Sequence, residues 1–250
     1  RSMVLEKAGL CAEDIRYLFS GDLLGQLVAT SFGAGGMNIP MYGLYGACST
    51  SGESLSLAAM TVSAGYANRA MALTSSHFAS AEKQFRFPLE YANQRPLAAT
   101  WTVTGSGAFL VSKEKESKQK GIFCHVKITG ITAGKVVDFG VKDSMNMGAC
   151  MAPAACDTIF QNLQDFGRMP EDYDKIITGD LGYVGQKILL DLLEEKGYLI
   201  ENQHMDCGIE IFDAETQDTH SGGSGCGCSA TVLASYILPK IEKGDRKSVV

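Results

Sequence analysis

The alternation of apolar and polar positions is clearest in residues 41–61, where an apolar stretch passes through a turn of small residues into a helical pattern. The apolar stretch is short and predicts a strand. After the turn, apolar side chains recur at the spacing of a helix with one buried face: Leu55, Ala58, Ala59 and Val62. The turn itself, Gly46-Ala47-Cys48, therefore places Cys48 where a strand gives way to a helix.

Similar patterns predict strands and helices along the rest of the chain. Strands are expected at residues 17–20, 70–75, 101–112, 122–131, 176–178 and 207–212, and helices at 151–166 and 186–196. Gly105 and Gly107 lie inside one of these strands, which indicates that another part of the chain approaches its backbone closely. Strands that alternate with helices are typical of a layered α/β fold.

The two halves of the chain resemble each other. Residues 9–23 align with residues 167–181 at a constant offset, with six identities in fifteen positions. Each half then reaches a small-residue turn that contains a cysteine and opens a helix, at Cys48 and at Cys228. A repeat in the same order predicts a duplicated fold. We place the two halves at residues 1–118 and 119–250, on either side of a charged connection.

Composition and charge narrow the functional classes. The 250 residues are 45% hydrophobic and 20% charged with a net charge of −6, so a globular domain is expected and a nucleic-acid partner is not. We expect no membrane-spanning segment and no secretion, because no run of about 18 apolar residues and no signal-peptide pattern occurs. The eight scattered cysteines are typical of reduced cytosolic thiols, and their spacing does not predict a metal site.

Two chemical uses of Cys48 are open at this point. The N–H groups and the dipole at the start of a helix stabilise negative charge, so they can lower the pKa of a thiol and make it a nucleophile. The same N–H groups can instead bind the carboxylate of a ligand.

Several stretches together carry a resemblance to a known family. They are GDLLGQ, GLYGACSTSGE, TSSHFASAEKQFRFPLEYANQRP, TVTGSGAFLVS, VVDFGVKDSMNMGACMAPAACDTI, IITGDLG and GGSGCGCSATV. Over essentially its whole length the chain resembles the stage V sporulation protein AD family, a branch of the thiolase-like superfamily. This implies a duplicated α/β/α/β/α layered fold with a pseudo-twofold repeat. Members of the family are longer at both ends, so we expect the start of the first half and the last strands of the second to be missing.

The resemblance also implies a function. It implies a protein of spore-forming Firmicutes that binds dipicolinic acid (pyridine-2,6-dicarboxylate), as the free acid or as its calcium chelate, for uptake into developing spores. No cofactor is implied, and calcium enters only as part of the ligand. The implied partners are membrane-associated spore transport proteins of the SpoVA complex and a second copy, joined through the strand after the Cys48 helix. The implied location is the cytoplasm or the periphery of the spore inner membrane.

Condensing enzymes of this superfamily pair the cysteine with a histidine and an asparagine, or with two histidines, from the second half. The corresponding stretches here, residues 179–183 and 227–229, contain neither residue type. We therefore expect a binding protein in which Cys48 is a vestigial nucleophile and no residue is catalytic. A Cys48-dependent acyltransferase and a scaffold for membrane partners are the alternatives.

The expected ligand-binding residues are chosen for a dianionic aromatic ligand, which needs cations, N–H donors and apolar walls. They are Cys48, Ser76, His77, Lys83, Arg86, Asn146, Met147, Asp180, Leu181 and Cys228. Asp22 and Asp180 occupy equivalent positions of the repeat, and both are also expected to cap the turn that follows a strand.

Overall fold

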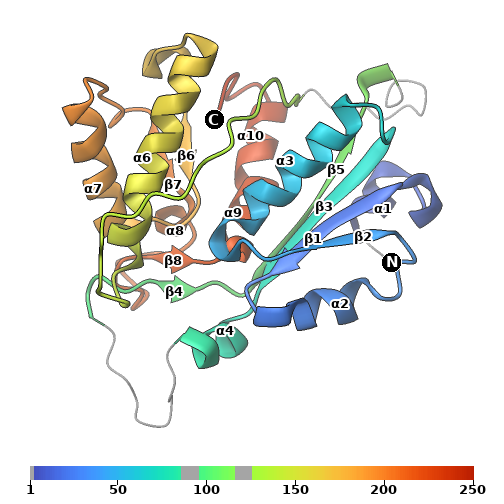
Figure 1. Ribbon diagram of the computed structural model, residues 1–250, viewed down its shortest axis with the longest axis horizontal. Helices are drawn as coiled ribbons and strands as arrows, with labels where there is room; N and C mark the ends of the chain where they lie inside the picture. Colours follow the sequence, from blue (N-terminus) through green and yellow to red (C-terminus); the bar gives the residue numbers. More distant parts are fainter. Residues whose placement is uncertain (1–2, 86–95, 116–125) are drawn as a thin grey trace.

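A four-stranded sheet forms the centre of the first half of the chain (Figure 1). The computed structural model describes residues 3–85, 96–115 and 126–250, without the side chains of 83–85. The strand order is β2-β1-β3-β5, in which β1, β2 and β3 are parallel and β5 is antiparallel to β3. The strands are β1 (Tyr17–Asp22), β2 (Met41–Leu44), β3 (Arg69–Ser76) and β5 (Gly105–Ser112).

Helices cover both faces of this sheet, as an α/β layered fold requires. Helices α3 (Thr50–Ser63) and α9 (Cys226–Val232) pack on one face, while α1 (Met3–Ala8) and α2 (Val28–Ala34) lie on the other. Successive residues of β1 point to opposite faces of the sheet, so Phe19 packs with α3 and Leu18 packs with α1 and α2.

The second half packs two long helices against two short strands. Helices α6 (Met147–Phe166) and α7 (Gly182–Glu195) enclose a core with β6 (Ile176–Thr178), which pairs in parallel with β7 (His204–Asp206). Strand β4 (Trp101–Thr102) pairs with β8 (Gly223–Ser224) and so connects the two halves. The remaining segments are α4 (Phe78–Phe85), α8 (Cys207–Glu210), α10 (Leu238–Glu242), η1 (Ala12–Asp14), η2 (Gly25–Leu27), η3 (Ala47–Ser49), η5 (Pro170–Asp172) and η6 (Leu233–Ile237).

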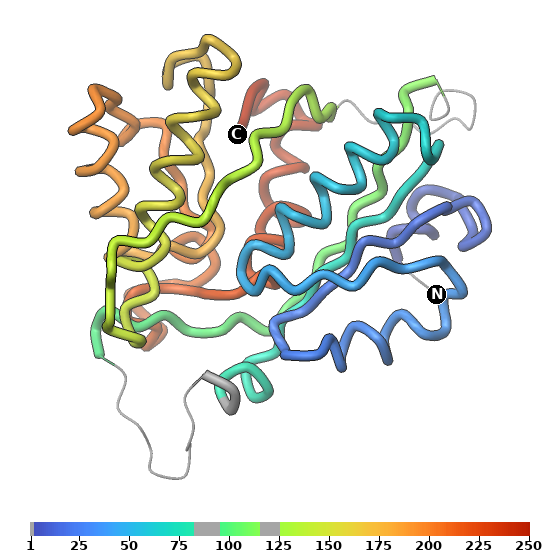
Figure 2. The backbone as a smooth tube through the Cα atoms, in the orientation of Figure 1, coloured from blue at the N-terminus to red at the C-terminus, as the bar shows by residue number. Residues whose placement is uncertain are grey.

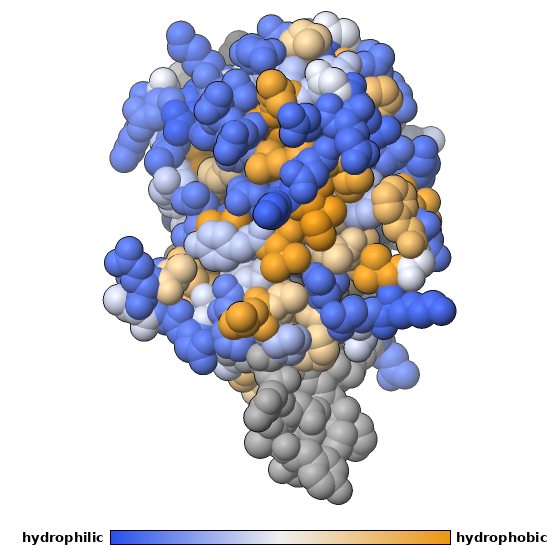
Figure 3. Space-filling model, turned by 90° about the vertical axis from the view of Figure 1, so that its left-hand side faces the viewer, coloured by the Kyte–Doolittle hydropathy of each residue, from blue (hydrophilic) through white to orange (hydrophobic). Residues whose placement is uncertain are grey.

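The surface beside α6 and α7 keeps some apolar character. Figure 3 shows a band of hydrophobic side chains on this side of the molecule, and Ile188 and Leu192 of α7 are only partly buried against the core. None of the helices in the described ranges combines the length and the apolar character of a membrane span.

The sequence repeat has a structural counterpart. Asp14 closes a short 3₁₀ turn by accepting a hydrogen bond from the N–H of Cys11 (3.1 Å), and Asp172 does the same for Met169 (2.8 Å). Each turn leads into a strand, β1 or β6, so the aligned segments adopt the same local structure.

Most of the expected elements are present, with shifted ends. The expected strands at 17–20, 70–75 and 176–178 and the helix after Cys48 are confirmed. The expected helix at 151–166 begins at Met147 instead, because Asn146 caps it by accepting a hydrogen bond from the N–H of Ala149 (3.1 Å). The strand expected at 101–112 is divided into β4 and β5.

Two expected strands are wrong. Residues 207–210 form helix α8, because the carboxylate of Asp206 accepts a hydrogen bond from the N–H of Ile209 (3.2 Å) and so starts a helical turn. Residues 126–131, the described part of the strand expected at 122–131, contain no strand and lead toward the C-terminal end of α6 (Figure 2). A β-carbon on Gly130 would meet the ring of Phe166, so a side chain at this position would displace that exposed ring.

The strand expected to carry a dimer contact lies inside the sheet. The strand after the Cys48 helix is β3, and it is hydrogen-bonded to β1 on one side and to β5 on the other. Within the described sheet, the strand order leaves β2 at one edge and β5 at the other. The dimer itself stays a prediction.

Candidate functional site

Cys48 lies in the short turn η3 between β2 and α3, as the sequence predicts. The residue before it, Ala47, has a left-handed backbone conformation (φ +50°), which turns the chain sharply from strand to helix. The Cys48 side chain packs with Leu23, Ala81 and Cys226, so residues from both halves surround the sulfur.

A carboxylate lies beside this thiol. Asp180, which follows β6, is buried and accepts hydrogen bonds from the N–H of Gly225 (2.8 Å) and the hydroxyl of Ser224 (3.3 Å). Burial raises the pKa of the Cys48 thiol well above its ordinary value, and the negative charge of Asp180 raises it further. The helix start therefore does not make Cys48 a thiolate, and the thiol is protonated at neutral pH.

The neighbouring cysteines are protonated for the same reason. The Cys226 thiol donates to the carbonyl of Ser75 (3.2 Å), and burial raises its pKa to about 12. Cys228 is fully buried in a core cluster with Val103 and Cys207. No histidine of the described residues is among the groups that shift the pKa of Cys48. In that same part of the chain, no three histidine, cysteine or acidic side chains converge as a metal site.

A hollow of about 510 Å³ opens next to this cluster, at the C-terminal ends of β1 and β3 and near the starts of α4 and β5. Its wall includes Leu23 and Ala81, which also pack with Cys48. Hydroxyl groups and one imidazole supply most of the remaining lining: Ser75, Ser76, Ser80, Thr104, Ser106 and His77. The hollow therefore combines many hydrogen-bond donors and acceptors with an apolar part of its wall.

Glycines let the two halves meet at this point. A β-carbon on Gly227 would lie 2.5 Å from the carbonyl oxygen of Gly105, and one on Gly107 would lie 2.8 Å from that of Ala230. The prediction that another segment approaches the backbone at Gly105 and Gly107 is confirmed, and the segment is α9. The N–H of Gly227 donates to Ser76 Oγ (3.0 Å), which itself donates to the carbonyl of Val103 (2.6 Å).

Four of the expected site residues lie at the hollow or at the thiol beside it. Ser76 and His77 line the hollow, and Cys48 and Asp180 form the adjacent pair. The side chain of Lys83 and the whole of Arg86 lie outside the described residues.

Four other expected site residues have structural roles instead. Asn146 caps α6, and Met147 is the first residue of that helix. Leu181 is buried in the core between α6 and α7, and Cys228 is buried beside Val103. Each stood near a candidate motif in the sequence, but none of them lines the hollow.

The two repeated aspartates behave differently. Asp22 accepts hydrogen bonds from the N–H groups of Leu24 and Thr30 (both 2.7 Å), so the expected turn cap is confirmed there. Asp180 instead accepts hydrogen bonds from residues just before α9. The N–H groups that follow Asp180 in the chain donate to Asp206. The repeat preserved the aspartate but not its partners.

The hydroxyls of Ser75, Thr104 and Ser106 were not predicted. They meet because the antiparallel register of β3 and β5 places Ser75 opposite Ser106. The only signal in the sequence was the run of small polar residues at 104–107, which does not specify a strand partner.

The acidic neighbour of Cys48 gives a direct prediction. In Asp180→Asn, the pKa of the Cys48 thiol falls, because the negative charge is removed while the amide oxygen can still accept from Gly225. We expect alkylation of Cys48 by iodoacetamide at pH 8 to be slow in the parent and severalfold faster in the variant, measured by mass spectrometry of the labelled peptide. An equal rate in both proteins would show that Asp180 does not hold the thiol protonated.

Comparison with known proteins places these features in a family. The family model described as "Stage V sporulation protein AD (SpoVAD)" matches residues 1–250. The chain is 45% identical over 243 residues to stage V sporulation protein AD of Bacillus subtilis (strain 168), a match that covers 97% of this chain and 69% of that protein.

Solved structures show the fold. A variant of OleA from Xanthomonas campestris bound with cerulenin has a TM-score of 0.64 and 13% identity, covering 96% of this chain and 69% of that one. The 3-oxoacyl-[acyl-carrier-protein] synthase III from Aquifex aeolicus has a TM-score of 0.56 and 13% identity, covering 96% and 72%. The expected thiolase-like fold is thus confirmed.

Proposed function

The chain belongs to the stage V sporulation protein AD family, and from this premise we propose that it binds dipicolinic acid for spore uptake in the hollow beside Cys48, without catalysis. The observation that carries the proposal is the pairing of the thiol with Asp180. Acyl transfer requires a thiolate or a base that forms one. Burial and a carboxylate keep the Cys48 thiol protonated, and the hollow beside it has space for a ligand.

The hollow suits a small polar aromatic molecule. Its volume of about 510 Å³ falls in the range of roughly 300–1,000 Å³ usual for small-molecule sites. The hydroxyls of Ser80, Thr104 and Ser106 can donate to carboxylate oxygens, while Leu23 and Ala29 offer an apolar surface to a pyridine ring. Because the carboxylate of Asp22 also lines the hollow, the calcium chelate, which carries no net charge, is favoured over the free dianion.

Calorimetric titration with dipicolinate, with and without calcium, tests this proposal. We expect Ser106→Ala and His77→Ala each to weaken binding about tenfold, the usual effect of losing a hydrogen bond to a charged group. Ser235→Ala, on the exposed surface of η6, is the matched control and is expected to bind like the parent. Absence of heat in every condition, or equal affinities in all variants, would overturn the proposal.

Cys-dependent acyl transfer is the second candidate, because the fold is that of condensing enzymes and Cys48 occupies the strand-to-helix turn. This activity would leave an acyl adduct on Cys48 after incubation with an acyl-CoA. Mass spectrometry of the protein would detect the adduct. The scaffold role, the second copy and the membrane-associated partners stay predictions.

A further inference from the structure

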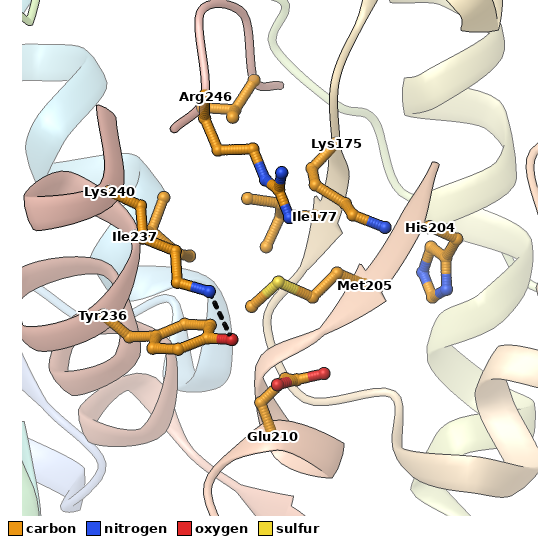
Figure 4. A pocket seen from close by; sticks show the side chains of 10 residues that line it. Lys175, Ile177, His204, Met205, Glu210, Tyr236, Ile237, Lys240 and Arg246 are labelled. Atoms are coloured by element: carbon orange, nitrogen blue, oxygen red, sulfur yellow. Dashed lines mark hydrogen bonds between the residues drawn. The ribbon is translucent and has the colours of Figure 1, made fainter. Parts of the chain in front are cut away.

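A second cavity of about 220 Å³ lies in the other half of the chain, and it shares no lining residue with the hollow beside Cys48. Strands β6 and β7, the helical segments η6 and α10, and the C-terminal residues surround it (Figure 4). Apolar side chains form much of its wall: Ile177, Met205, Ile237 and Val249.

Three cationic side chains converge on this cavity from different elements. Lys175 directly precedes β6, Lys240 lies in α10 and Arg246 lies in the C-terminal segment. In Figure 4, Lys240 and Arg246 extend toward the Met205 side chain, and the Lys175 ammonium group extends toward His204. Each is half-buried. No carboxylate of the described residues lies within ion-pair distance of any of them.

The hydrogen bonds of these cations leave further donors free to bind. Lys175 Nζ donates to the carbonyl of Asn202 (3.0 Å), and Lys240 Nζ donates to the hydroxyl of Tyr236 (2.8 Å). Arg246 Nη1 donates to the carbonyl of Asp245 (3.2 Å). An ammonium group carries three protons and a guanidinium five, so each of these groups has donors left for an anion.

Carboxylates offset only part of this positive charge, and one of them, Asp174, lies outside the wall but interacts with the charge of Arg246. Glu210 is the one carboxylate among the described lining residues, and it is exposed. His204 adds no charge at neutral pH, because burial, and then the charge of Lys175, lower its pKa to about 4. Like charges held together in a partly desolvated cavity repel one another unless an anion binds among them.

We propose that this cavity binds the phosphate group of a small phosphate monoester. A phosphate monoester carries three terminal oxygens and nearly two negative charges, which suits three donors that arrive from three directions. A carboxylate presents two oxygens in one plane and would satisfy fewer of them. The organic part of the ester lies on Met205 and Ile237. A soluble phosphate ester and the phosphate of a lipid headgroup share this chemistry.

Phenyl phosphate is the probe for the soluble source, and calorimetry measures its affinity. We expect Lys175→Gln and Arg246→Gln each to weaken binding about tenfold or more, because each removes a charge-assisted hydrogen bond. Glu210→Gln is expected to strengthen binding, because it removes the carboxylate that repels the phosphate. The control is Lys187→Gln, which removes the same charge from an exposed position on α7 outside the cavity.

Flotation with vesicles distinguishes the lipid source. Retention on phosphatidic acid vesicles but not on phosphatidylcholine vesicles, with loss of retention in Arg246→Gln, would assign the site to a lipid phosphate. Binding of phenyl phosphate without retention would assign it to a soluble ester. The proposal is overturned if phenyl phosphate gives no heat, if benzoate binds as tightly, or if Lys187→Gln weakens binding as much as Arg246→Gln.

Discussion

Gly227→Ala is expected to destabilise the fold by about 3 kcal/mol or more, the upper range for overpacking a core position. The new β-carbon would meet the side chain of Ser76 and would lie 2.5 Å from the carbonyl oxygen of Gly105 and 2.8 Å from the N–H nitrogen of Ser76. Two of these atoms are backbone atoms of strands in the central sheet, so they cannot move aside as a flexible side chain would. Helix α9 must therefore retreat from β3 and β5.

Urea unfolding at pH 7 measures this effect, and Gly52→Ala is the matched control. Gly52 lies in α3, the equivalent helix of the first half, and nothing lies within 4 Å of a β-carbon built there. Alanine favours a helix over glycine, so this control is expected to gain up to about 1 kcal/mol. A Gly227→Ala protein that unfolds at the parent's urea midpoint would contradict the close contact between α9 and the sheet.

The same contact links stability to the proposed ligand site. Ser76 lines the hollow and accepts the hydrogen bond from Gly227, so a displaced α9 changes the wall of the hollow. We expect folded Gly227→Ala protein, isolated at low temperature, to bind dipicolinate more weakly than Gly52→Ala protein.

The features predicted correctly from the sequence are those that local patterns determine. The position of Cys48 follows from an apolar stretch, a turn of small residues and helical spacing, all within about twenty residues. The alignment of residues 9–23 with 167–181 likewise corresponds to matching local turns, because Asp14 and Asp172 each bond to the residue three positions earlier. Gly105 and Gly107 indicated a close approach, although they did not identify α9 as the segment involved.

The features that were not predicted depend on partners distant in the sequence. Ser106 reaches the hollow because of the register between β3 and β5, and Asp180 lies beside Cys48 because β6 ends at the start of α9. Asn146 and Leu181 were expected to bind the ligand, but Asn146 caps α6 and Leu181 is packed in the core of the second half. Neither the register nor the competing structural role can be deduced from residue types alone.

The second large effect is a loss of stability in acid through His204. This imidazole is buried in a chain of hydrogen bonds in which the Gln186 amide donates to Nδ1 (2.9 Å) and Nε2 lies 3.0 Å from the Thr178 hydroxyl. That hydroxyl donates its proton to Asp206 (2.6 Å), so His204 is the donor to Thr178. Both ring nitrogens are satisfied in the neutral form, and burial lowers the pKa of His204 from 6.5 to about 4.

The lowered pKa of His204 determines the direction in which stability changes with pH. Below pH 6.5 the unfolded chain binds a proton at His204 that the folded protein does not, so stability falls as the pH falls toward 4. Between pH 7 and pH 4.5 we expect His204 to account for a loss of about 2–3 kcal/mol. Burial raises the pKa of Asp206, which acts in the opposite direction, so the parent alone cannot isolate the effect.

His204→Gln separates the two contributions, because it removes the titrating ring and leaves Asp206 in place. The free energy of unfolding is measured by urea titration at pH 7 and at pH 4.5 for the parent, for His204→Gln and for His77→Gln, which removes an exposed imidazole. The His204 variant is expected to be less stable than the parent at pH 7 but to lose about 2–3 kcal/mol less on acidification. The His77 variant should lose as much as the parent. If the three proteins lost the same stability, His204 would not be held neutral, and the hydrogen-bond chain from Gln186 to Asp206 would be assigned wrongly.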